Sequence, residues 1–136
     1  MGFRLPRAIE LFVLVGLGYA LGAELSWSWF GGSNVGLAFF PAAGVTIAAL
    51  VLTRRPWWPV ILLAAGTAEF VVDVAHGLGP GVSLGYAAAN VVEPLTAAVL
   101  LSVTARGAVP SVDLTVRADA IRFSACALVV LSLIHI

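Results

Sequence analysis

Long apolar runs separated by short polar connections make up most of this chain. Each run approaches the roughly 20 residues that a helix needs to cross about 30 Å of hydrocarbon. The pattern therefore predicts an all-α fold, a polytopic transmembrane helix bundle. The predicted spans cover approximately residues 8–27, 35–53, 56–75, 82–105 and 118–136.

The positions of the basic residues predict how these spans are oriented. Arg residues precede the first run, separate the second from the third, and lie around the start of the fifth. They are Arg4, Arg7, Arg54, Arg55, Arg106, Arg117 and Arg122. The connections over residues 24–34 and 73–81 contain no Arg, and the chain has no Lys. Because basic residues concentrate in cytoplasmic loops, the N-terminus is predicted to be cytoplasmic.

Residues at the edges of the runs agree with this topology. Trp27 ends the first run at the outer side, and Trp57 and Trp58 begin the third at the inner side, as is typical of interfacial aromatic residues. Pro56 opens the third run, where a first helical turn accepts proline without losing a hydrogen bond. The glycine-rich residues 77–81 predict the turn that reverses the chain.

Composition supports a membrane location and narrows the partners. The chain is 61% hydrophobic and 10% charged, which leaves too little polar surface to cover a soluble globule of 136 residues. The lipid bilayer is therefore the expected partner. The net charge is zero and no basic patch is present, so we expect no nucleic-acid partner. The lone Cys126 has no partner for an internal disulfide and is expected to be a small buried hydrophobic residue.

The two ends of the chain bear on its completeness. The fifth run is still apolar at Ile136, so we interpret residues 1–136 as part of a larger membrane domain. The closing letters LSLIHI resemble translated sequencing-adapter DNA, and no expectation rests on residues 132–136. The first run could be a cleaved secretory signal, with small residues at Ala20 and Gly22. Its length and the span that follows favour an uncleaved helix.

Acidic and amide side chains inside the predicted spans are the candidate site. Glu69 and Asp73 are four residues apart and share one face of the third helix, whereas Asn90 and Glu93 are three apart on the fourth. At about 1.5 Å per residue, Glu69 lies about 19 Å from the inner edge and Asn90 about 12 Å from the outer edge. The two residues thus fall at nearly the same depth, and Glu93 falls near the midplane.

An isolated charge near the bilayer centre costs about 2.5–3.5 kcal/mol on insertion scales, so these side chains are expected to face the bundle interior. Asn90 and Glu93 are the leading candidates for a ligand or coupling site, with Glu69 and Asp73 as partners. An interhelical clamp that only fixes packing explains the same residues equally well. For Asp73, which lies near the outer edge, solvation by water is the favoured expectation.

Two prolines are predicted to bend helices. Pro94 follows Glu93 directly and removes the hydrogen bond to the carbonyl group of Asn90. Pro41 lies inside the second predicted span and is assigned the same role. Small residues at GxxxG spacing, Gly18 with Gly22, are typical of helices that approach closely.

The chain lacks the motifs of common enzyme classes. It contains no Walker loop, no HExxH, no GxSxG and no cluster at metal-ligand spacing. We expect no catalytic residue, no metal site and no cofactor, and we predict that the chain is not an enzyme.

Several spaced motifs resemble one family. They are FPAAGV at residues 40–45, RRPWWPVILLAA at 54–65, ANVVEPLTAAVLL at 89–101, and PSVD and DAIRF at 110–113 and 119–123. Together they are similar to the first type of membrane-associated sensor domain, the MASE family of bacterial signalling proteins. The resemblance covers about residues 8–130.

This resemblance implies a sensory input module of about eight spans in the bacterial inner membrane, followed by a cytoplasmic kinase, cyclase or phosphatase domain. The chain would supply the first half, and any enzymatic activity would belong to the output domain further along the same polypeptide. A homodimer of the full-length protein is left open. The family's asparagine and glutamate pair corresponds to Asn90 and Glu93, and Pro94 departs from the family pattern.

The predicted function is therefore a membrane-embedded sensory module that relays a stimulus to an output domain. Half of a proton- or solute-coupled transporter is the alternative, because acids near the midplane beside a broken helix also build carriers. A scaffold that anchors a partner is the third class.

Overall fold

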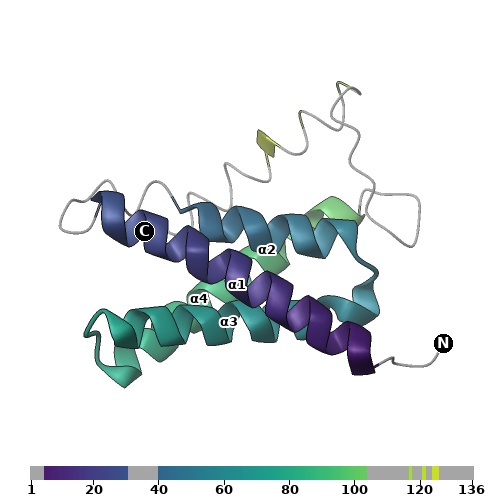
Figure 1. Ribbon diagram of the computed structural model, residues 1–136. Helices are drawn as coiled ribbons and strands as arrows, with labels where there is room; N and C mark the ends of the chain where they lie inside the picture. Colours follow the sequence, from purple (N-terminus) through teal and green to yellow (C-terminus); the bar gives the residue numbers. More distant parts are fainter. Residues whose placement is uncertain (1–4, 31–39, 104–116, 118–120, 122–123, 126–136) are drawn as a thin grey trace.

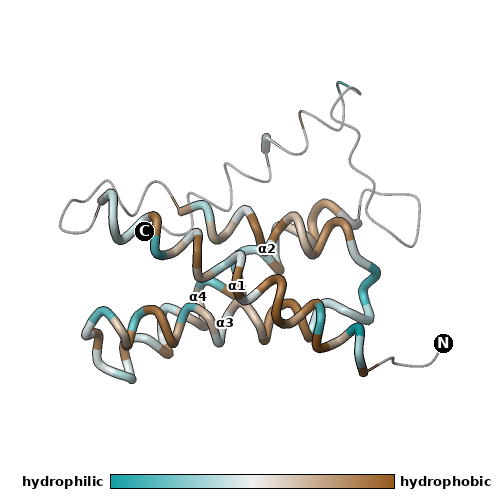
Figure 2. Tube along the Cα trace, in the orientation of Figure 1, coloured by the Kyte–Doolittle hydropathy of each residue, from teal (hydrophilic) through white to brown (hydrophobic). Residues whose placement is uncertain are grey.

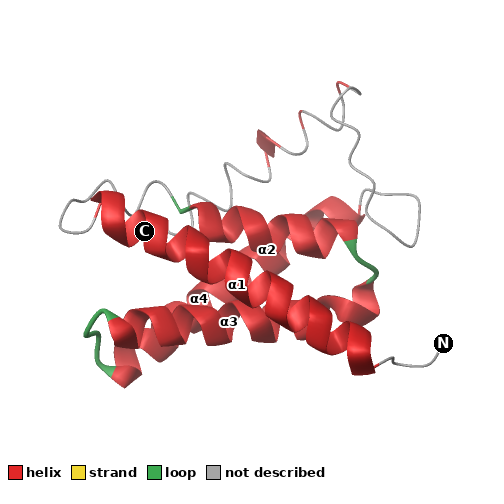
Figure 3. Ribbon diagram, viewed as in Figure 1, coloured by secondary structure: helices red, strands yellow, loops and turns green. Residues whose placement is uncertain are grey.

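The computed structural model describes residues 5–30 and 40–103, together with the single residues Arg117, Ile121, Ser124 and Ala125 (Figure 1). Within these residues the only regular structure is helical (Figure 3). The predicted span over residues 118–136 lies outside the described ranges apart from three single residues, as do Arg4 and Arg106. The all-α prediction is confirmed for the described part of the chain.

The main helices are α1 (Leu5–Phe30), α2 (Pro41–Leu52), α3 (Trp58–Ala75) and α4 (Pro80–Val103), and a short 3₁₀ turn, η1 (Arg55–Trp57), precedes α3. Three stretches are long and apolar enough to cross a membrane: Leu5–Trp29, Arg55–Ala75 and Pro80–Leu101. They contain most of the first, third and fourth predicted spans. By contrast, α2 has 12 residues, or about 18 Å at the usual rise, and covers only part of the second predicted span.

The two prolines that were predicted to bend helices occupy different positions. Pro41 is the first residue of α2, after Phe40 at the N-cap position. The predicted bend at Pro41 is thus corrected to a helix start, which is favourable because the first turn has no use for its missing N–H. Pro94 lies inside α4, which continues as one helix to Val103, and its side chain is fully buried.

The helices pack so that α1 crosses both α2 and α3, while α4 lies behind them in the view of Figure 1. The α1 to α2 crossing is close because Gly22 lies directly against Ala42: a Cβ added to Gly22 would stand 2.8 Å from the Ala42 backbone nitrogen. Gly18 faces Val45 in the same contact. The predicted GxxxG face of the first run is therefore the face that packs on α2.

Two apolar clusters form the core. The first joins Val15, Leu50, Trp58, Ile61, Ala64 and Ala98, and the second joins Tyr19, Ala23, Ala42, Ala65 and Val72. Outward-facing positions are also apolar, with Leu14, Leu17 and Leu21 of α1 all more than half exposed. A helix that is apolar on all sides fits a lipid environment better than water.

The two ends of the bundle differ in chemistry. Arg7 of α1 lies over the Trp57 ring at 5.9 Å, and Arg55 lies over Trp58 at the same distance. The described basic side chains of α1 and of the α2–α3 connection therefore share one end, and this connection is the most hydrophilic part of the trace in Figure 2. The turn between α3 and α4 lies at the opposite end.

Candidate functional site

A hydrogen bond between α3 and α4 lies at the centre of the candidate site. The Asn90 side-chain amide donates to the Oε1 atom of Glu69. The depth count from the sequence predicted these two residues at one level, and the bond confirms it. The Glu69 side chain is only 5% exposed, so its partner is a protein group and not the surroundings.

Asp73 lies one helical turn beyond Glu69 and is buried to the same degree. Its Oδ2 atom has no hydrogen-bond partner among the described residues. The favoured expectation for Asp73, solvation at the outer edge, is therefore corrected. The side chain points into the bundle because α3 presents Ala65, Glu69, Val72 and Asp73 on the face covered by its neighbours.

Tyr19 brings α1 into the site. Its side chain is fully buried, and its ring meets Phe40 edge-on with centroids 5.9 Å apart. Its hydroxyl group lies beside the side chains of Glu69 and Asn90, but no hydrogen bond of good geometry is formed with the described residues. A buried hydroxyl group without a partner is uncommon in folded proteins.

Sequence reasoning missed Tyr19, although a signal was present. Val15, Tyr19 and Ala23 follow one another at four-residue intervals, and all three are buried. This spacing places them on one face of α1. Tyr19 is also the only tyrosine of the first run, so it carries the only hydroxyl group on that face near the middle of α1.

Glu93 does not join these residues. It is half-buried one turn after Asn90 and makes no hydrogen bond or ion pair with the part of the chain that the structure describes. Thr46 is buried in α2 and donates to the carbonyl oxygen of Ala42 at 3.3 Å. We use the name buried polar cluster for Tyr19, Glu69, Asp73 and Asn90.

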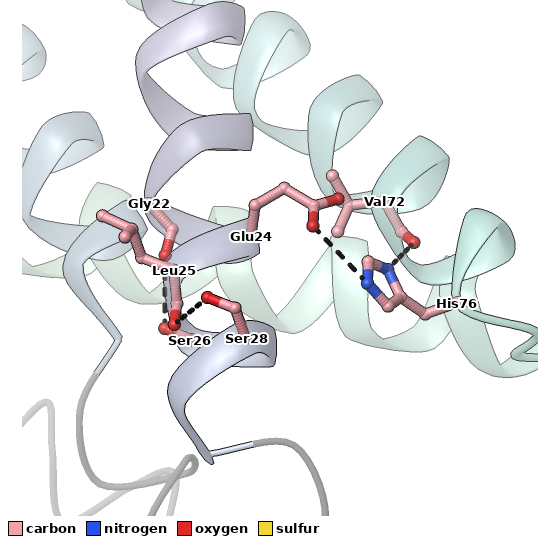
Figure 4. A network of polar contacts seen from close by, with 7 residues as sticks. All are labelled: Gly22, Glu24, Leu25, Ser26, Ser28, Val72 and His76. Atoms are coloured by element: carbon pink, nitrogen blue, oxygen red, sulfur yellow. Dashed lines mark hydrogen bonds and ion pairs between the residues drawn. The ribbon is translucent and has the colours of Figure 1, made fainter.

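A second group of contacts closes the α3 end of the bundle. The Nε2 atom of His76 lies 3.5 Å from Oε2 of Glu24, and its Nδ1 atom lies 2.9 Å from the carbonyl oxygen of Val72 (Figure 4). The imidazole ring also stacks on Trp27 of α1. Trp27, which the sequence assigned to the interface, therefore packs against a neighbouring helix.

The buried polar cluster is acidic, and no described Arg side chain lies beside it. Two carboxyl groups lie one turn apart, and the nearest cationic candidate is His76, which faces Asp73 and also pairs with Glu24. Arg7 and Arg55 lie at the opposite end of the bundle. Within the described ranges no three His, Cys, Asp or Glu side chains come together as a metal site. Such an arrangement can hold protons, water or a single small cation.

Comparisons with protein-family models, with curated proteins and with solved structures returned no match.

Proposed function

We propose that this chain is the membrane-embedded input segment of a bacterial signal-transduction protein, in which the buried polar cluster couples helix packing to an output domain on the same polypeptide. The observation that carries the proposal is the hydrogen bond from Asn90 to Glu69, which joins two apolar helices beside Tyr19 of a third. Polar groups buried between such helices bias their packing, because alternative arrangements leave these groups unpaired.

A sensor needs two packings of similar free energy that a stimulus can distinguish. The buried polar cluster can make a second packing similar in free energy, since Tyr19 and Asp73 each keep a polar atom without a partner in the described packing. A different arrangement of α1 against α3 could supply these partners. The motifs resembling the membrane-associated sensor domains, including the asparagine and glutamate of α4, favour this function over a scaffold.

The proposed topology has five spans in this chain, with the N-terminus in the cytoplasm of a bacterial inner membrane. In support, Arg7 and the α2–α3 connection lie at the same end of the bundle, as the positive-inside rule requires of cytoplasmic segments. A cysteine-labelling experiment tests the orientation. In a Cys126→Ser background, Gly79→Cys is expected to react with an impermeant reagent in intact cells, and Thr53→Cys only after permeabilisation. The reverse pattern would refute the orientation.

The functional test uses the full-length protein in its native membrane and measures the output activity. Asn90→Ala removes the donor to Glu69, and Glu93→Gln removes the charge that the sequence placed near the midplane. Val92→Ala, a change of an exposed neighbour on α4, is the control. The expected result is an altered output for Asn90→Ala with an unaltered output for the control.

Unchanged output in both Asn90→Ala and Glu93→Gln, at normal expression, would remove the coupling role. Loss of solute uptake without any change of signalling output would instead favour the transporter class. The sequence that follows this segment provides an independent criterion: a kinase, cyclase or phosphatase domain supports the sensor, whereas further spans repeating these in inverted topology support transport.

A further inference from the structure

The buried polar cluster contains more oxygen atoms than its protein hydrogen bonds use. Asp73 Oδ2 and the Tyr19 hydroxyl oxygen are both buried and lack a partner among the described residues. Tyr19 is fully buried and Asp73 is 95% buried, so no bulk solvent reaches them. Such groups normally carry a cost that a bound ion, water molecule or proton removes.

The charges around the buried polar cluster indicate that a group bound there carries a positive charge. From α3 come Glu69 and Asp73, and from α1 comes the neutral Tyr19. The α4 side contributes the neutral Asn90, with Glu93 a turn further on. The helix α2 (Pro41–Leu52) has no titratable residue at all.

Among the residues that the structure describes, the only neighbouring group that can be positive is His76. Its Nε2 atom pairs with Glu24, and its Nδ1 atom contacts the backbone of Val72, so both ring nitrogens are occupied elsewhere. Two carboxyl groups, one turn apart in an apolar bundle, therefore accept no hydrogen bond from a described cationic side chain, and the electrostatic effect of His76 is on Asp73 alone.

We propose that Tyr19, Glu69, Asp73 and Asn90 form a binding site for one small monovalent cation, a proton or a sodium ion. Carboxylate, hydroxyl and amide oxygens are the donors that hard cations prefer. Intramembrane carboxyl pairs neutralise their charge with such ions, and the same chemistry serves H⁺ and Na⁺ in membrane proteins.

The position of Asp73 provides the route to the site. It lies in the last turn of α3, where its carbonyl oxygen accepts from Leu78 N at 3.1 Å and where the chain turns at Gly77. Glu69 lies one turn deeper and holds α4 through Asn90. An ion entering from this end of the bundle meets Asp73 before it meets the bond that joins α3 to α4.

A cation at this site would hold α1, α3 and α4 together, because its ligands come from all three helices. The role of the cation as a stimulus rests on the proposed sensor function, whereas the binding of the cation to this site does not depend on that function. The test of binding is therefore a measurement on the purified protein, and the test of signalling remains the output activity.

The experiment measures the thermal unfolding midpoint of the detergent-solubilised chain by tryptophan fluorescence in two titrations. In the first, NaCl replaces choline chloride at constant ionic strength and pH. In the second, pH is varied at constant NaCl. At a cation concentration about a hundredfold above Kd, we expect the midpoint to rise by about 5 °C or more. A rise in the first titration identifies sodium, and a rise on acidification alone identifies the proton.

The double variant Glu69→Gln with Asp73→Asn is expected to lose this response. Glu10→Gln, which removes one carboxyl charge at an exposed position of α1, is the matched control and is expected to keep it. If the double variant does not fold, Tyr19→Phe removes a single oxygen ligand and is expected to weaken sodium binding about tenfold. If the ion is a proton, the same change is expected to strengthen its binding, because the carboxylates lose a hydroxyl donor.

The site would be overturned if the unfolding midpoint of the wild type responded to neither ion, or if the response survived in the double variant. Where the double variant does not fold, unchanged cation affinity in Tyr19→Phe would overturn the site. An equal loss in Glu10→Gln would also overturn it. These results are distinct from failure of the sensor. If Asn90→Ala alters the output and no cation response is found, the sensor function is retained and the cation site is rejected. If the cation binds and the output is unchanged, the cation site is retained and the sensor function is rejected.

Discussion

The imidazole ring of His76 lies flat on the indole ring of Trp27, with ring centroids 4.6 Å apart and planes 8° apart. This contact joins the C-terminal ends of α1 and α3 at the bundle end opposite Arg7 and Arg55. Since Oε2 of Glu24 lies 3.5 Å from Nε2 of the same imidazole, the side chain at the C-cap of α3 makes two different contacts with α1.

Replacing His76 by Ala is expected to lower the free energy of unfolding by about 0.5–1.5 kcal/mol, through loss of the stacked pair. His76→Phe retains an aromatic ring but loses the contact with Glu24, so it should recover part of that loss. Denaturant unfolding in detergent, followed by tryptophan fluorescence, measures both variants. Equal destabilisation by Ala and Phe would show that stacking contributes nothing.

Gly22→Ala is expected to destabilise the α1 to α2 contact by about 1–3 kcal/mol, because the added methyl group meets backbone atoms of Ala42 that cannot move aside. Gly85→Ala is the matched control, since Gly85 also has GxxxG spacing but has open space around it. The control should be neutral or slightly stabilising, as alanine favours helix. Thermal unfolding of the two variants side by side decides the matter, and a tolerated Gly22→Ala would contradict the close approach.

Trp58→Phe is expected to cost about 1 kcal/mol of unfolding free energy. The Trp58 indole N–H donates to the Leu50 carbonyl oxygen at 2.9 Å, and phenylalanine leaves that buried acceptor unpaired. Trp29→Phe makes the same substitution at an exposed position near the end of α1 and should have a smaller effect. A larger loss in Trp29→Phe would reverse the assignment of Trp58 as the structural residue.

A double-mutant cycle tests the bond between Glu69 and Asn90. Glu69→Ala and Asn90→Ala are expected to show a coupling free energy of about 0.5–2 kcal/mol, as for hydrogen bonds between membrane helices. The control cycle pairs Glu69→Ala with Glu93→Gln, where no contact is present, and should be additive within about 0.5 kcal/mol. Comparable coupling in both cycles would mean that the effect is not carried by the Asn90 amide.

Much of the fold could be predicted from hydropathy and spacing. The apolar runs gave helices, and the depth of Glu69 and Asn90 followed from the rise per residue, because a bilayer fixes where each helix begins and ends. Contacts between helices were harder to predict from the sequence. Asp73 lies near a helix end, where water is the usual partner, yet neighbouring helices cover it.

The role of Tyr19 could not be predicted from depth alone. Which face of α1 meets α3 depends on how Gly22 fits against Ala42, and this fit is a property of two backbones. Likewise, Pro41 was predicted to bend a helix because the apolar run continues through it, whereas α2 begins at this residue. Apolar runs in lipid do not mark helix ends as polar residues do in soluble proteins.

The contact of Gly22 with Ala42 also determines how α1 can move. The two backbones approach closely there, so translation of α1 toward α2 is blocked, whereas α1 can still tilt about the contact. From Gly22, α1 extends about 26 Å to Leu5 and about 12 Å to Phe30 at the usual helical rise. A tilt about this pivot therefore displaces the Leu5 end about twice as far as the Phe30 end. A small displacement of α1 beside His76 thus produces a larger displacement beside Arg7.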